Sequence, residues 1–200
     1  MNTTSIFVEL VIIGLHTFIW MGLLVLTFIG YQNLDLEKVF TLNLALPILA
    51  ITYILGILVD RVSDMARTAQ DMRLRSRYDF QRLPGFNSMR FYILSKSSNI
   101  YQQLEYTRSR LRIARASILN FAFTAIAAAL FVWFQLGKTL AVEHRVMTCI
   151  AAMLAGALLT WISYEAWAAL SNTYTAGTIR GYQVLRDEAE KTKAIEVDTV

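Results

Sequence analysis

Four apolar stretches dominate the sequence, and each is long enough to cross a lipid bilayer. They cover about residues 6–29, 40–59, 116–136 and 146–170. A transmembrane helix needs about 20 mainly apolar residues to span roughly 30 Å of hydrocarbon. The first stretch is too long for a cleaved signal peptide, and no Lys or Arg precedes it. We therefore expect an all-α integral membrane protein with four transmembrane helices.

Composition excludes several other classes of protein. Hydrophobic residues make up 56% of the 200 residues and charged residues 17%, against about 45–50% and 25% in soluble domains. A single cysteine, Cys149, excludes a disulfide scaffold, and two histidines are too few for paired haem ligands. The sequence holds no dinucleotide, Walker, zinc-protease or serine-hydrolase motif. We therefore expect no enzyme activity, no cofactor and no metal site.

The distribution of Lys and Arg predicts the orientation. Residues 61–115 contain twelve of them, and four more follow the last apolar stretch. Basic residues accumulate on the cytoplasmic side of membrane proteins. We expect a multi-pass protein of the bacterial inner (plasma) membrane, with the middle segment and both termini in the cytoplasm.

The segment between the second and third apolar stretches has helical periodicity. The second helix is expected to continue to about Tyr78, since Pro84 and Gly85 are the first residues that would stop it. A third helix is expected from about Asn99. Between them, the apolar run at 91–94 fits either a short helix or a strand.

The sequence thus predicts four regions, which together make a membrane bundle with a helical cytoplasmic extension. The fourth helix is expected to continue beyond the membrane, weakened at Gly177 and Gly181. The regions are transmembrane helices 1 and 2 (1–60), a basic cytoplasmic helical hairpin (61–115), transmembrane helices 3 and 4 (116–170) and a cytoplasmic helical tail with a frayed end (171–200).

Basic side chains of the hairpin are the candidate binding surface. Anionic lipid attracts each of them by about 1 kcal/mol near a membrane surface, and an acidic protein partner would use the same charge. A purely topological role is the simpler alternative, and nucleic-acid binding is the least favoured. The candidates are Arg73, Arg75, Arg77, Arg108, Arg110, Arg112 and Arg115.

Ionisable groups and a proline inside or beside the spans are the candidates for gating or for lining a pore. Charged groups inside a bilayer are expensive, so each is a functional hypothesis by default. The structural alternative is that these groups pair with one another. Glu9 would pair with Glu165 or Arg115, and ion pairs along one helix would form among Asp60, Arg61, Asp64 and Arg67. The candidates are Glu9, His16, Pro47, Asp60, Arg61 and Glu165.

Small residues concentrate in the last two spans. Ala152 and Gly156 have the small-xxx-small spacing that lets helices approach closely in lipid. Packing within one chain is the first interpretation, and an interface between copies is the alternative.

Two segments carry a resemblance to a known group. Residues 53–64 (YILGILVDRVSD) and 108–116 (RSRLRIARA) resemble small four-span membrane components of bacterial anti-phage defence systems, such as the membrane subunit of Kiwa systems. The resemblance covers about a tenth of the chain. It implies a membrane sensor or effector that oligomerises and works with a cytoplasmic partner.

Three functions are compatible with these features. The first is a non-enzymatic, oligomeric membrane sensor or anchor whose hairpin recruits or controls a soluble protein. The second is a small homo-oligomeric ion channel or membrane-depolarising effector lined by the second helix. The third is a proton-coupled transporter that uses Glu9 and His16.

Overall fold

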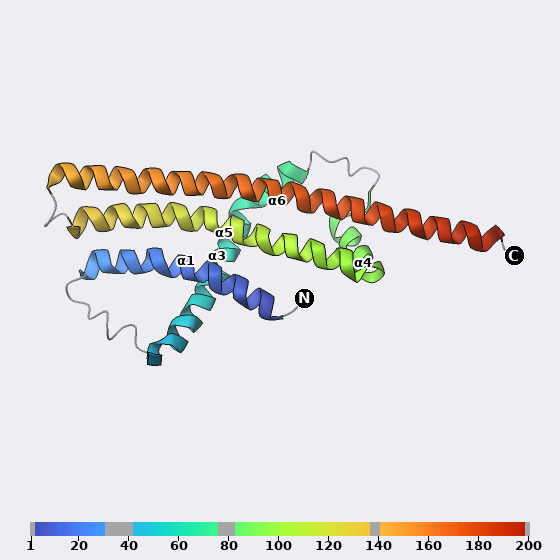
Figure 1. The fold of residues 1–200 in the computed structure, drawn as a ribbon, viewed down its shortest axis with the longest axis horizontal. Coiled ribbons are helices and arrows are strands. Elements are labelled where there is room, and N and C mark those ends of the chain that lie inside the picture. The colour runs from blue at the N-terminus through green and yellow to red at the C-terminus, as the bar shows by residue number, and fades with distance from the viewer. Residues whose placement is uncertain (1–2, 31–41, 76–82, 137–140, 199–200) are drawn as a thin grey trace. The chain divides into compact units, whose positions relative to one another are not determined.

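The structure is a computed structural model that describes residues 3–30, 42–75, 83–136 and 141–198. The described residues are 96% helical and contain no strand, which confirms the all-α prediction. The helices are α1 (Thr3–Ile29), α3 (Leu42–Arg75), α4 (Phe86–Lys96), α5 (Ser98–Phe134) and α6 (Val142–Asp198), drawn in Figure 1.

Four of these helices, α1, α3, α5 and α6, are long and apolar enough to cross a membrane. The shortest of them, α1, has 27 residues, which corresponds to about 40 Å of helix at 1.5 Å per residue. That length exceeds the roughly 30 Å of a hydrocarbon core. The prediction of four helices of spanning length is therefore confirmed.

The chain divides into two compact units, which we describe separately. The span unit consists of Asn2–Arg67 and Arg112–Trp167, and the extension unit mainly of Thr68–Leu111 and Ala168–Val200. Helices α3, α5 and α6 each contribute residues to both units. A boundary between the units therefore falls inside continuous helices and not in a loop.

In the span unit, α1 packs against both α3 and α5. Figure 1 shows α1 beside the span-unit part of α5, with α3 crossing α1. The backbones of α1 and α3 approach so closely that a Cβ atom on Gly14 would lie 1.7 Å from the Thr52 carbonyl oxygen. Helix α6 packs on α5, where a Cβ atom on Gly156 would lie 2.1 Å from the Cβ of Ala125. Ala152, one turn before Gly156, is half-buried.

The extension unit has a separate apolar core made by α4, α5 and α6. Met89 and Ile93 of α4 are completely buried. Two ring pairs join α4 to α6: Phe86 with Tyr174 (5.7 Å between centroids) and Tyr92 with Tyr182 (5.3 Å). Aromatic pairs of this edge-to-face kind contribute about 0.5–1.5 kcal/mol beyond the area that they bury. The apolar run at 91–94 is therefore helical and belongs to α4, which packs on α5 and α6.

Helix boundaries agree with the sequence in some places and differ in others. Helix α5 starts at Ser98, one residue before the expected Asn99, and continues unbroken to Phe134. Helix α3 includes Pro47, so this proline does not end the helix. The predicted end of α3 near Tyr78 lies outside the described residues. Helix α1 ends where expected, because Gly30 adopts a positive φ of 88° and its N–H donates to Leu26 O at 3.0 Å.

The C-terminal tail belongs to the long helix α6. Helix α6 is continuous from Val142 to Asp198 and passes through both Gly177 and Gly181. At these glycines the helix packs closely: a Cβ atom on Gly181 would lie 3.0 Å from Ile100 Cγ2. Farther on, Arg186 and Glu190 form an i,i+4 ion pair at 2.8 Å, and such pairs support exposed helices. Packing and local charge pairs explain why the tail is helical.

Candidate functional site

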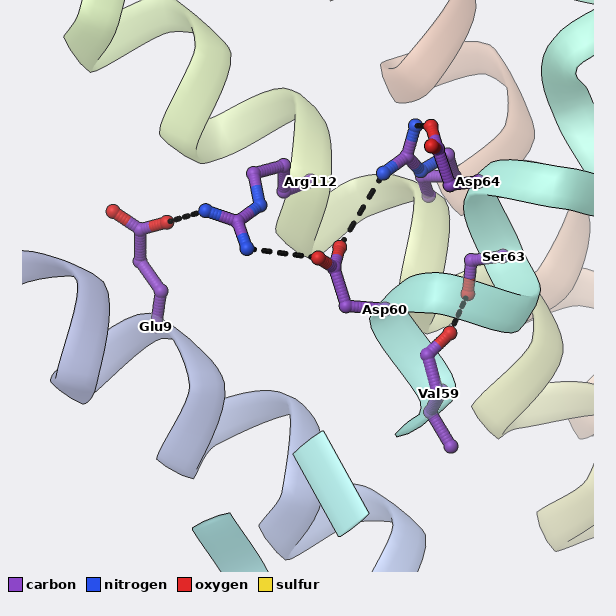
Figure 2. Close-up of polar contacts among 7 residues, drawn as sticks. Glu9, Val59, Asp60, Ser63, Asp64 and Arg112 are labelled. Atoms are coloured by element: carbon purple, nitrogen blue, oxygen red, sulfur yellow. Dashed lines mark hydrogen bonds and ion pairs between the residues drawn. The ribbon is translucent and has the colours of Figure 1, made fainter. Parts of the chain in front are cut away.

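A cluster of five charged side chains joins three helices of the span unit, as Figure 2 shows for most of its members. Arg112 of α5 lies between two carboxylates: its Nη2 donates to Asp60 Oδ2 of α3 at 2.8 Å, and its Nη1 is 3.5 Å from Glu9 Oε2 of α1. Arg115, almost one turn later on α5, pairs with Asp60 Oδ1 at 3.3 Å and also with Asp64. We call these five residues the charge cluster.

Most of the charge cluster is withdrawn from solvent. The side chains of Glu9 and Arg115 are only 5% and 7% exposed, and that of Asp60 is 17% exposed. Removing one member of a buried ion pair costs about 3–5 kcal/mol, since the other charge stays buried without its partner. Asp64 is different, because its side chain is 48% exposed. The charge cluster therefore has a buried centre around Asp60 and an open edge at Asp64.

The geometry decides which of the predicted partners meet. Glu9 pairs with Arg112, which was expected to be a binding residue and not a partner of Glu9. Asp60 pairs across to α5, more than 50 residues away in sequence. Arg67 stacks on aromatic rings of α6, 5.5 Å from the Tyr164 centroid and 5.7 Å from that of Trp167. The charges at the end of the second span therefore connect different helices.

The basic run of α5 is divided by the fold. Arg112 and Arg115 belong to the charge cluster, whereas Arg108 and Arg110 lie in the extension unit. Arg108 is 3.5 Å from Glu105 and keeps 44% of its side chain exposed. Arg110 stacks on the Tyr106 ring at 5.8 Å. Only part of the run is thus available to a lipid or a protein partner.

The remaining predicted residues are dispersed. The half-buried His16 of α1 packs against α5, with its ring 5.6 Å from that of Phe121. Pro47, Arg61 and Glu165 are exposed, as is Arg73. The side chain of Arg75 and the whole of Arg77 lie outside the described residues.

Asn120 is a polar residue in the middle of α5 that sequence reasoning missed. It is 1% exposed, and its Nδ2 donates to Ile13 O at 3.1 Å. Its Oδ1 accepts from Trp20 Nε1 and from the Thr17 hydroxyl, both at 3.1 Å. Interhelical hydrogen bonds of this kind hold helices together in lipid. The signal was available, since Asn120 is an amide well inside a mainly apolar stretch.

The close crossing of α1 and α3 was also missed. A Cβ atom on Gly56 would lie 1.9 Å from the Leu10 carbonyl oxygen, which mirrors the contact of Gly14 with Thr52. The signal in the sequence was the small-xxx-small pair of Thr52 and Gly56, which is the same spacing that was recognised in the fourth span.

An ion pair connects α4 and α5 inside the extension unit. Arg90 Nη2 donates to Glu105 Oε1 at 2.7 Å, and the Glu105 side chain is 6% exposed. Burial of the Arg90 side chain opposes its charge, but Tyr174 and Glu105 together raise the pKa of Arg90 above its ordinary value. The guanidinium therefore stays charged, and its function here is to hold α4 on α5.

The outer face of α4 presents apolar side chains. Phe91 is 69% exposed and Leu94 is 47% exposed. They line a pocket of about 210 Å³ together with Asn87, Arg90 and Tyr101. We call this the α4 surface. Aromatic and arginine side chains around a small pocket are the features that dominate the energetics of protein interfaces.

Within the described ranges, no group of three or more His, Cys, Asp or Glu side chains is placed to hold a metal ion. Comparison with protein-family models, curated proteins and solved structures finds none that matches this chain.

Proposed function

We propose that this protein is a multi-pass membrane anchor whose extension unit binds a soluble protein and passes changes in the span unit to it. The observation that carries the proposal is the continuity of α5 and α6. These helices have 37 and 57 residues and each runs without a break from one unit into the other. A continuous helix transmits tilt or displacement, whereas a flexible loop between units would absorb it.

The charge cluster supports this mechanical role. It connects α1, α3 and α5 through Arg112 and Arg115, so these helices are expected to move as one body. The same pairing favours an anchor over a channel, because both carboxylate oxygens of Asp60 are engaged by guanidinium groups and are not left to line a pore. Likewise, the pairing of Glu9 with Arg112 favours a structural role over proton transfer.

The α4 surface is the proposed docking site for the partner. Phe91 and Leu94 would enter an apolar hollow on the partner, and Arg108, which shares Glu105 with Arg90 of the α4 surface, would face acidic groups. We propose a cytoplasmic position for the extension unit on the basis of the Lys and Arg distribution. The partial resemblance to anti-phage membrane components suggests defence as the setting.

Self-association is part of the proposal. Only 11% of the apolar windows of α3 and α6 is buried, compared with 28% and 33% for α1 and α5. The faces of α3 and α6 are therefore open to lipid or to further copies of the chain.

The experiment is isolation of the tagged chain at its native level in mild detergent, followed by native mass spectrometry. Wild type is expected to carry a soluble protein at a fixed ratio. The double variant Phe91→Asp with Leu94→Asp is expected to lose it, since each anchor of an interface typically contributes more than 1 kcal/mol. The matched control is Val184→Asp, which also places a carboxylate on an exposed apolar position of the extension unit.

Two outcomes contradict the proposal. One is that wild type is isolated without a soluble protein. If it is then isolated as a homo-oligomer alone, the result favours the channel, which ion-flux measurements in liposomes would test. The other is equal loss of the soluble protein in the α4-surface variant and in Val184→Asp.

A further inference from the structure

An open apolar groove lies between α5 and α6 in the span unit. Its volume is about 290 Å³, and its lining is entirely apolar apart from one thiol. The lining residues are Ile126, Ala129, Leu130, Trp133, Cys149 and Met153. On α5 they recur at intervals of three and four residues, so they share one face of that helix. The groove is therefore a continuous strip along the helix pair.

A positive charge stands at one end of this groove. The guanidinium of Arg145 lies 5.6 Å from the centroid of the Trp133 ring. Arg145, Cys149 and Met153 are four residues apart on α6, which places them on one helix face. From Arg145 to Met153 the helix rises about 12 Å. The groove thus runs from a cation and an indole into the apolar part of the spans.

The other end of the groove is closed by helix packing. Gly156, three residues after Met153 on α6, packs against Ala125, the residue before Ile126 on α5, and a Cβ atom on Gly156 would lie 2.1 Å from the Cβ of Ala125. Along the groove the Cys149 thiol lies 3.5 Å from the Ala129 carbonyl oxygen, so it forms part of the floor. The contact of Gly156 with Ala125 limits the groove at the end away from Arg145.

We infer that this groove binds one acyl chain of a phospholipid, with the lipid phosphate paired to Arg145. An apolar strip within spanning helices accepts hydrocarbon, and a polar ligand would find no hydrogen-bond partner along it. Guanidinium groups bind phosphate through paired charge-assisted hydrogen bonds. Trp133 holds the guanidinium over its ring, and tryptophan is enriched at the headgroup level of membranes.

A second copy of the chain is the competing occupant, and the position of the cation disfavours it. An apolar helix from another copy would fill the strip but would place no anion beside Arg145. A phospholipid supplies both the chain and the anion in one molecule.

The test is native mass spectrometry of the purified protein titrated with phosphatidylglycerol or with diacylglycerol of the same acyl chains. Wild type is expected to retain one phosphatidylglycerol and to bind diacylglycerol about fivefold more weakly, because one basic group near a membrane surface attracts an anionic lipid by about 1 kcal/mol. Arg145→Gln is expected to remove that difference. Ala129→Phe fills the groove and is expected to abolish binding, whereas Ala155→Phe, at an exposed position of α6 outside the groove, leaves it unchanged.

A chemical readout on the wild-type chain tests the site independently of the filling variant. Cys149 is the only cysteine and is half-buried, so its alkylation by a maleimide reports occupancy. Phosphatidylglycerol is expected to slow alkylation in wild type and to have less effect in Arg145→Gln. Equal affinity of wild type for the two lipids, no protection of Cys149, or a dimer that Ala129→Phe dissociates would each overturn the inference.

Discussion

Replacing Asp60 with Asn tests whether the charge cluster holds the span unit together. The change keeps the size of the side chain and one hydrogen-bond acceptor, and it removes the charge that faces Arg112 at 2.8 Å and Arg115 at 3.3 Å. Asp64 provides a matched control on the same helix, because Asp64→Asn removes the same charge one turn later at the open edge of the charge cluster.

The expected loss follows from burial and from the partners that remain. Each charge pair at about 4 Å is worth about 4 kcal/mol at an effective dielectric constant of 20, before the cost of desolvation. Breaking a buried pair costs about 3–5 kcal/mol overall. Arg112 keeps Glu9, Arg115 keeps Asp64, and Asp60 is 17% exposed. We therefore expect Asp60→Asn to lower the free energy of unfolding by about 2–3 kcal/mol. For Asp64→Asn, with its 48% exposed side chain, we expect about 0–1 kcal/mol.

The assay is reversible unfolding by SDS in mixed micelles, followed by tryptophan fluorescence, for wild type and the two variants. A gap of at least about 1 kcal/mol between the variants is the predicted result. Equal losses, or a larger loss for Asp64→Asn, would refute the reasoning that burial around Asp60 decides the energetics.

Three further predictions address the helix contacts. Gly56→Ala places a methyl group 1.9 Å from the Leu10 carbonyl oxygen, so it should destabilise the protein by about 2 kcal/mol or more in the same assay. The control Gly22→Ala, whose methyl group would have nothing within 4 Å, should stabilise the protein by up to about 1 kcal/mol. A larger loss of stability for Gly22→Ala than for Gly56→Ala would contradict the close crossing of α1 and α3. Asn120→Ala should lower the free energy of unfolding by about 1–2 kcal/mol. The Thr124 hydroxyl bonds to the Asn120 carbonyl oxygen of the same helix at 2.7 Å, so Thr124→Ala should change this free energy by no more than about 0.5 kcal/mol. Similar losses for the two variants would contradict an interhelical role of Asn120. Ala69→Pro should interrupt α3 just beyond the span unit. We expect less of the soluble partner to be isolated with this variant, whereas the variant itself should still be found in the membrane fraction. Recovery of as much partner as with wild type would argue against coupling through α3.

The spans were predictable because they depend on local composition. Twenty apolar residues determine their own secondary structure in a bilayer, so α1 and the continuous α5 follow from the sequence directly. The helical state of residues 91–94 was not decidable locally, because it depends on Met89 and Ile93 packing against distant residues of α5 and α6. The helical tail was predicted, but the close packing of Gly181 against Ile100 and Ile93 was not, because it joins residues distant in sequence.

The charge cluster shows a similar limit. The sequence identified Glu9, Asp60 and the arginines of α5 as unusual, since charged groups beside apolar stretches need partners. It did not identify which pairs form, because Asp60 and Arg112 are 52 residues apart and meet only when α3 crosses α5. Asn120 was passed over because one neutral amide changes hydropathy little, although its burial at 1% exposure makes its hydrogen bonds decisive.

Photocrosslinking in living cells tests the proposed recruitment of a soluble protein most directly. A benzoylphenylalanine residue in place of Phe91 reports on the α4 surface, and the same residue in place of Phe123, which is 46% exposed in the span unit, is the control. The account predicts one adduct with a soluble protein from position 91 and none from position 123. Position 91 giving no protein adduct, or giving only adducts between copies of this chain, would contradict it.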